Sequence, residues 1–69
     1  MTKIKLLNNG GYGGLDNVNF PAFLTCNVNW EGAFVTGGQL VSIGGDPDCF
    51  YLEFDYIFLI RTSFEVIYD

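Results

Sequence analysis

The chain has 69 residues, which is enough for one domain (residues 1–69) and no more. Its net charge is −5 with only three lysine and arginine residues, which excludes direct nucleic acid binding because cations must replace the counterions of the phosphate backbone. With 49% hydrophobic and 17% aromatic residues, it holds more apolar surface than so short a chain readily buries. Either the core packs with unusual efficiency, or part of that surface faces a partner or a second copy of the chain, and we expect the second.

The first residues and the apolar runs indicate the cellular location of the protein. The first residues lack the apolar stretch of a signal peptide, so we expect none, and the longest apolar run, residues 50–60, is interrupted by Glu53 and Asp55. A membrane span needs about 18 apolar residues. We therefore expect no membrane association, a cytoplasmic location, and free thiols at Cys26 and Cys49.

The first half of the chain has the composition of short strands separated by glycine turns. Residues 3–7 predict a first strand, which ends at a glycine-rich loop, and residues 15–21 are expected to be extended. Residues 23–30 alternate with a period of two and predict a second strand. Its inward side chains are expected to be Leu24, Cys26, Val28 and Trp30. Glu31 and Gly32 can then close a two-residue hairpin onto a strand at residues 33–36.

Residues 37–43 carry signals for two structures. Thr36 and Gln39 have the spacing of a capping box, and Gly44 stands where a helix would end, which favours one or two turns of helix. Valine and isoleucine favour the alternative, a Gly-Gly hairpin into a strand at residues 39–43.

The second half predicts two aromatic strands. Residues 50–60 alternate, with an apolar inward set at the even positions, and Ile57 and Leu59 indicate burial on both faces near the end. Residues 61–63 can turn the chain into a last strand at residues 64–68. The predicted fold is mainly β: a small barrel or a twisted antiparallel sheet of about five strands, with one short helix possible at residues 37–43.

The glycine-rich segment, Asn-Asn-Gly-Gly-Tyr-Gly-Gly at residues 8–14, has two interpretations. It lacks the lysine and hydroxyl residue of a phosphate loop, and Leu15 and Asp16 follow it instead. The first interpretation is a tight passage at positive φ angles with Tyr12 as a cap over the core. The second is a contact surface for a partner or small ligand with Tyr12 as its anchor.

Catalytic and metal-binding groups are scarce. The chain has no histidine, and no serine or cysteine has a visible activating neighbour, so we expect no enzyme activity and no cofactor. Two cysteines 23 positions apart cannot complete a tetrahedral zinc site. Asp46 and Asp48 are too few ligands for calcium and are expected to form a solvated turn.

The opening of the chain resembles a known group. The run Lys-Leu-Leu-Asn-Asn-Gly-Gly-Tyr-Gly-Gly-Leu-Asp-Asn-Val-Asn-Phe-Pro, at residues 5–21, is similar to the opening of small uncharacterised proteins of tailed bacteriophages. Residues 39–44, 48–50 and 56–60 are also similar. The resemblance implies only a setting, the cytoplasm of an infected bacterium, where small acidic proteins often block host enzymes or immune factors.

Charge and aromatic content together predict an interaction protein that binds and inhibits a host protein. Residues 41–69 account for the whole negative charge, so the partner is expected to have a basic surface. The predicted partner-binding residues are Tyr12, Asp46, Asp48, Tyr51, Glu53 and Asp55. The predicted contacts of a homo-oligomer are Phe50, Phe54, Phe64 and Tyr68. The alternative function is an oligomeric sponge for a small ligand or nucleotide signal, with sites between subunits.

Overall fold

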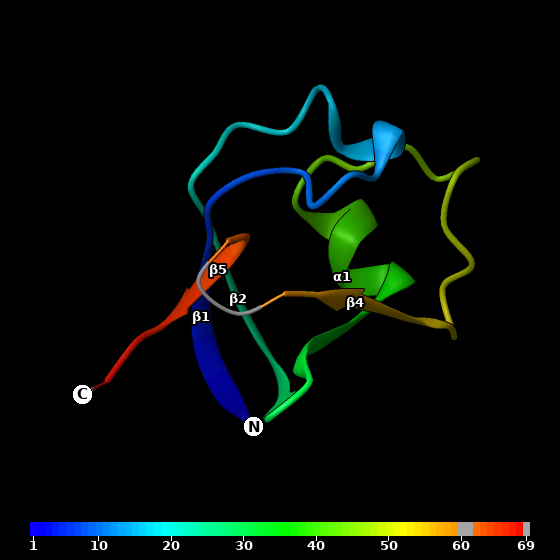
Figure 1. Ribbon diagram of the computed structural model, residues 1–69. Coiled ribbons are helices and arrows are strands. Elements are labelled where there is room, and N and C mark those ends of the chain that lie inside the picture. Colours follow the sequence, from blue (N-terminus) through cyan, green and yellow to red (C-terminus); the bar gives the residue numbers. More distant parts are fainter. Residues whose placement is uncertain (60–61, 69) are drawn as a thin grey trace.

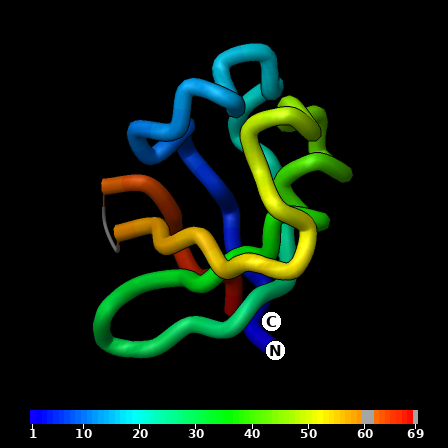
Figure 2. Tube along the Cα trace, turned by 90° about the vertical axis from the view of Figure 1, so that its right-hand side faces the viewer, coloured from blue at the N-terminus to red at the C-terminus, as the bar shows by residue number. Residues whose placement is uncertain are grey.

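The computed structural model describes residues 1–59 and 62–68 and shows a mainly β domain, as the sequence predicts. Its strands form one antiparallel, five-stranded sheet in the order β4-β3-β2-β1-β5, which curls into a half-barrel (Figures 1 and 2). The strands are β1 (Thr2–Leu6), β2 (Ala22–Asn29), β3 (Gly32–Thr36), β4 (Asp55–Phe58) and β5 (Phe64–Val66). The loops around residues 7–21 lie at the top of both views, and the helix α1 and the segment that leads to β4 lie at the right.

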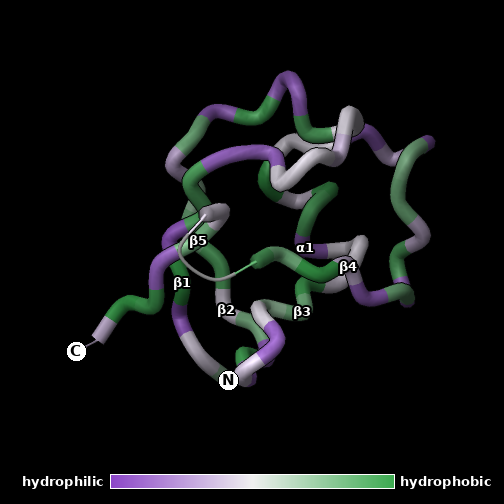
Figure 3. Tube along the Cα trace, viewed as in Figure 1, coloured by the Kyte–Doolittle hydropathy of each residue, from purple (hydrophilic) through white to green (hydrophobic). Residues whose placement is uncertain are grey.

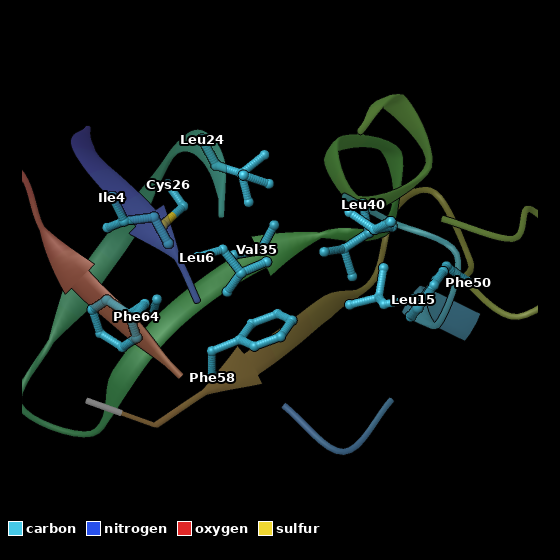
Figure 4. Packing of buried hydrophobic residues seen from close by; sticks show 13 residues of the cluster. Ile4, Leu6, Leu15, Leu24, Cys26, Val35, Leu40, Phe50, Phe58 and Phe64 are labelled. Atoms are coloured by element: carbon cyan, nitrogen blue, oxygen red, sulfur yellow. The ribbon is translucent and has the colours of Figure 1, made fainter. Parts of the chain in front are cut away.

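The core fills the concave face of the sheet. Alternation of side chains along the strands sends one face inward, and the largest fully buried side chains come from all parts of the chain (Figure 4). They are Phe58, Phe64, Ile4, Leu6, Leu15, Leu40, Val35 and Cys26. Leu24 is buried beside Cys26 and Val28 packs against the cluster, which confirms three of the four inward residues predicted for the second strand.

Trp30 is the exception, and its prediction is wrong. The strand β2 ends at Asn29, which pairs with Gly32, so Trp30 and Glu31 form the two-residue turn. The indole is therefore 87% exposed. The turn begins one residue earlier than expected because Gly32 takes a φ of +148° and belongs to β3, where an added Cβ would collide with the Phe58 carbonyl.

The helix alternative at residues 37–43 is correct. The helix α1 (Gly37–Ser42) begins at a complete capping box, in which the Thr36 side chain accepts from the Gln39 amide and the Gln39 side chain accepts from the Thr36 amide. Gly44 follows at a φ of +113°, in the left-handed region that ends helices. Within the described ranges, no helix is long and apolar enough to cross a membrane.

The long strand expected at residues 50–60 is wrong over most of its length. Only Asp55–Phe58 forms a strand, β4, because its neighbour β3 stops at Thr36 and the chain then turns into α1. Without a partner strand the preceding residues form turns, and Leu52 and Phe54 are exposed instead of inward. Ile57 and Leu59 are also exposed, so the end of this segment is not buried on both faces.

The segment at residues 15–21 is not extended either. A short 3-10 helix, η1 (Gly13–Leu15), is followed by turns that carry Leu15 and Val18 into the core. The last strand is confirmed in part: β5 covers Phe64–Val66, and the Ile67 amide continues its ladder by donating to the Lys3 carbonyl. Ile60 and Arg61, which the sequence assigns to the long strand and the following turn, lie outside the described residues.

Candidate functional site

The glycine loop, residues 8–14, is held by hydrogen bonds within the chain. The Asn8 and Asn9 side-chain oxygens accept from the amides of Gly10 and Gly11, which take φ angles of +62° and +91°. A Cβ at Gly10 would lie 2.6 Å from the Phe58 ring, so only glycine fits there. These two amides are occupied by asparagine side chains, and that leaves them unavailable to a phosphate or other anion.

Tyr12 turns back from this loop onto the core. Its ring centroid lies 5.2 Å from that of Phe58, 5.7 Å from Tyr56 and 6.2 Å from Phe50, in tilted and edge-on arrangements typical of stabilising aromatic pairs. Its hydroxyl donates to the Ile57 carbonyl at 3.1 Å. The structure thus gives Tyr12 the role of a cap over the core. Its side chain is only partly exposed, unlike the exposed aromatic side chains of the acidic loop.

The acidic loop, residues 46–55, carries the other five predicted partner-binding residues on the surface. These are Asp46, Asp48, Tyr51, Glu53 and Asp55, and all are exposed. Between the carboxylates stand three large apolar side chains, with exposed fractions of 71% for Tyr51, 61% for Leu52 and 60% for Phe54. Figure 3 shows the loop as alternating hydrophobic and hydrophilic segments at the edge of the molecule beside α1.

The backbone of the acidic loop is fastened to the start of α1. The amides of Gly37 and Gly38 donate to the carbonyls of Phe54 and Leu52, at 2.9 and 3.2 Å. A Cβ at Gly37 would collide with the Tyr51 carbonyl, so the glycine permits this close approach. The Tyr51 amide in turn donates to the Tyr56 hydroxyl at 2.8 Å. The exposed aromatics therefore stand on an ordered backbone.

Two of the four predicted oligomer contacts lie in the core of the single chain. Phe50 and Phe64 are buried, Phe50 against Tyr12 and Tyr56 and Phe64 within the sheet, so neither ring offers surface to a second copy. Their apolar character signalled burial and did not distinguish a core from an interface. Phe54 and Tyr68 are exposed, as that prediction requires. Leu52, which the alternating pattern placed inward, is the surface residue that the sequence missed.

The surroundings of the two cysteines raise the pKa of both thiols. Partial desolvation and the neighbouring Asp46 raise the pKa of the Cys49 thiol, with a smaller contribution from Asp48, and burial raises the pKa of Cys26 in β2. Both thiols are free. A raised pKa keeps a thiol protonated near neutral pH, where it is a poor nucleophile. In residues 1–59 and 62–68, no three acidic, histidine or cysteine side chains gather to hold a metal ion.

A hollow lies over the β1–β2 ladder. It has a volume of about 360 Å³ and is lined by Lys3 from β1 and by Phe23, Leu24 and Thr25 from β2. Lys3 lies opposite Thr25 in the β1–β2 ladder, and Phe23 is largely exposed. The hollow thus combines one cation with one aromatic ring.

No family model, curated protein sequence or solved structure matches the chain. The candidate site therefore rests on geometry: a fastened, acidic loop with three exposed apolar side chains, on the far side of the core from β5 (Figures 1 and 2).

Proposed function

We propose that this protein is a non-catalytic inhibitor that binds a host protein through the acidic loop. The observation that carries the proposal is the exposure of Tyr51, Leu52 and Phe54 within one charged segment, where the rings of Tyr51 and Phe54 contact each other. Protein-binding surfaces have aromatic anchors at the centre and a polar rim around them. The loop has both parts, with the rim made of Asp46, Asp48, Glu53 and Asp55.

The charge of the rim defines the class of partner. Four carboxylates in ten residues favour a partner whose contact surface is rich in lysine and arginine, because opposite charges speed the encounter and select against acidic surfaces. The resemblance of residues 5–21 to bacteriophage proteins supports a bacterial partner. Inhibition follows if the basic surface is the one with which that partner binds its own anionic substrate.

The fastening of the loop favours binding further. The rings of Tyr51 and Phe54 pack in a tilted arrangement at a centroid distance of 5.0 Å, and the carbonyls of Leu52 and Phe54 accept from the first amides of α1. A surface that is ordered before binding loses less conformational entropy on association than a flexible loop does.

Capture from bacterial lysate with matched variants tests the proposal. Immobilised wild-type protein is compared with the double variant Tyr51→Ala/Phe54→Ala, and with Phe23→Ala/Trp30→Ala, which removes two exposed aromatics outside the loop. We expect a protein that wild type and the control retain and the loop variant loses. Raising salt from ~0.15 to ~1 M should weaken retention, since screening removes the charge attraction.

The identity of the captured protein completes this test. Its activity should fall when purified wild-type protein is added and should persist with the loop variant. A captured protein that the loop variant retains equally, or one whose activity is unaffected, contradicts the proposal.

The hollow lined by Lys3 and Phe23 favours a second candidate function, sequestration of a small aromatic anion. Its volume of about 360 Å³ falls in the range of ligand pockets, although the glycine-loop amides contribute nothing to it. Thermal unfolding with a panel of nucleotides tests this candidate: a ligand should raise the midpoint for wild type and have no effect on Lys3→Ala. If no nucleotide raises the wild-type midpoint, the sequestration function is excluded for this class.

A further inference from the structure

The two edges of the sheet differ in what covers them. Antiparallel ladders alternate, so every second residue of an edge strand directs its amide and carbonyl to the free side. On β5 the Ile67 amide donates to the Lys3 carbonyl, and the Leu7 amide donates to the Ser63 carbonyl, both toward β1. By alternation, the backbone groups of Val66 and Tyr68 are directed away from β1. Among the described residues, none forms a hydrogen bond to them.

The edge of β4 is occupied by contrast. The Gly37 amide donates to the Phe54 carbonyl, which sets the alternation and directs the backbone of Ile57 away from β3. The Ile57 carbonyl accepts from the Tyr12 hydroxyl, and the glycine loop lies against Phe58. A strand that approached β4 would have to displace Tyr12, whereas β5 presents an open ladder.

We propose that two copies of the chain pair antiparallel through the β5 edges, with Val66 of each copy opposite Val66 of the other. The Val66 pair exchanges both of its backbone hydrogen bonds, and Phe64 of each copy pairs with Tyr68 of the second copy. The two half-barrel sheets then continue into one, related by a twofold axis.

The convex face selects this register. Glu65 lies opposite Lys5 in the β1–β5 ladder, and Ile67 continues the same ladder beside Lys3. With Val66 on the axis, Glu65 lies between Lys5 of its own copy and Ile67 of the second copy. Lys3 of the second copy follows Ile67, so no two carboxylates are neighbours in this row. A register centred on Glu65 would place two glutamates directly opposite one another, which is destabilising.

The concave face gives Tyr68 a neighbour. Its side chain is 87% exposed in the single chain. In the dimer it lies on the same face as Val66 of the second copy, which is only partly buried in its own chain, so the pairing covers apolar surface of both residues. Net charge does not oppose this arrangement strongly. The acidic loops stand on the side of each molecule away from β5 in both views (Figures 1 and 2), so they lie at the outer ends of the dimer.

Proline substitutions on the two edges test the interface in the full chain. Val66→Pro removes an amide that faces away from β1, so it breaks the dimer ladder and spares the β1–β5 hydrogen bonds. Tyr68→Pro removes the next such amide, beyond the end of β5. The matched control is Ile57→Pro, which removes an outward amide of β4. Sedimentation velocity at ~100 µM, where a weak dimer is populated, reports the mass, and circular dichroism reports folding.

Wild type and Ile57→Pro should sediment at twice the chain mass of 7.7 kDa. Val66→Pro should raise the dimer dissociation constant about thirty-fold or more, from two lost hydrogen bonds. Tyr68→Pro should dissociate the dimer as well, and it decides the matter if Val66→Pro fails to fold. A monomeric wild type, a dimer that persists in every folded proline variant on this edge, or dissociation by Ile57→Pro alone overturns the proposal.

Discussion

The glycine loop and the acidic loop both carry tyrosine, yet they send it in opposite directions. In the glycine loop, the positive φ angles of Gly10 and Gly11 let the chain double back, so Tyr12 reaches Phe58 and the Ile57 carbonyl. In the acidic loop, carboxylates that must stay hydrated alternate with the aromatics, and Tyr51 and Phe54 remain outside. The comparison teaches that backbone freedom and charged neighbours decide whether an aromatic side chain serves the fold or the surface.

Truncation of the tyrosines should show the largest difference. Tyr12→Ala removes a ring that contacts Phe58, Tyr56 and Phe50, and should lower the free energy of unfolding by about 3 kcal/mol. Tyr51→Ala removes an exposed ring and should cost about 0.5 kcal/mol. Urea unfolding followed by circular dichroism measures both. Equal losses for the two variants would erase the distinction between the loops.

Alanine substitutions at three glycines test whether the backbone conformation of the glycine loop holds Tyr12 against the core. Gly10→Ala combines a φ of +62° with a Cβ 2.6 Å from the Phe58 ring, and should cost about 2 kcal/mol. Gly11→Ala has open space but a φ of +91°, and should cost about 1 kcal/mol. Gly13→Ala has neither constraint and serves as the control. A different order of the three midpoints in urea would show that the loop conformation is not what holds Tyr12 inward.

Removal of the helix cap should loosen the acidic loop rather than the glycine loop. Thr36→Ala deletes the hydroxyl that accepts from the Gln39 amide and should cost about 1 kcal/mol. The amides of Gly37 and Gly38, at the same end of the helix, donate to the carbonyls of Phe54 and Leu52. Because the lost cap loosens this helix end, the hydrogen exchange of these two glycine amides should become faster. The amide of Tyr12, which donates to the Asn9 carbonyl, should be unaffected. Faster exchange at Tyr12 would mean that the two loops are coupled.

The smallest expected effect concerns the thiols. Cys49 is exposed, but because its pKa is raised, it should react with iodoacetamide at about pH 7.5 more slowly than an ordinary surface thiol. Cys26 should react more slowly still because it is buried. Asp46→Asn removes a neighbouring charge that raises the pKa, so it should speed the reaction of Cys49 alone. Mass spectrometry of the two peptides follows the rates. An unchanged rate at Cys49 would argue against an influence of Asp46.

Local signals in the sequence were sufficient for the mainly β fold class and for the short helix. The period-two pattern predicted the inward set of β2, and the spacing of Thr36 and Gln39 predicted the start of α1, because both depend on near neighbours in the chain. The limit of β4 could not be predicted that way. A strand is only as long as its hydrogen-bonding neighbour, and β3 ends where α1 begins.

The candidate site was predictable in its charges and only partly in its aromatics. The carboxylates of the acidic loop are exposed, as expected for charged side chains. Phe50 and Phe54 are phenylalanines of the same loop, yet Phe50 is buried and Phe54, which stands between Glu53 and Asp55, is exposed. A distant residue contributes to the difference, since the Tyr12 ring from the glycine loop packs on Phe50, whereas the ring beside Phe54 is that of Tyr51 from the same exposed segment.

One spectrum tests the division between inward and outward tyrosines most directly. In photochemically induced nuclear polarisation, a flavin dye polarises only tyrosine rings that it can reach, so each tyrosine reports its own exposure. Tyr51 should give a strong signal and Tyr12 a weak one, and the Tyr68 signal should fall as concentration rises and the β5 edges pair. A Tyr12 signal as strong as that of Tyr51 would contradict the assignment of the glycine loop to the fold and of the acidic loop to a partner.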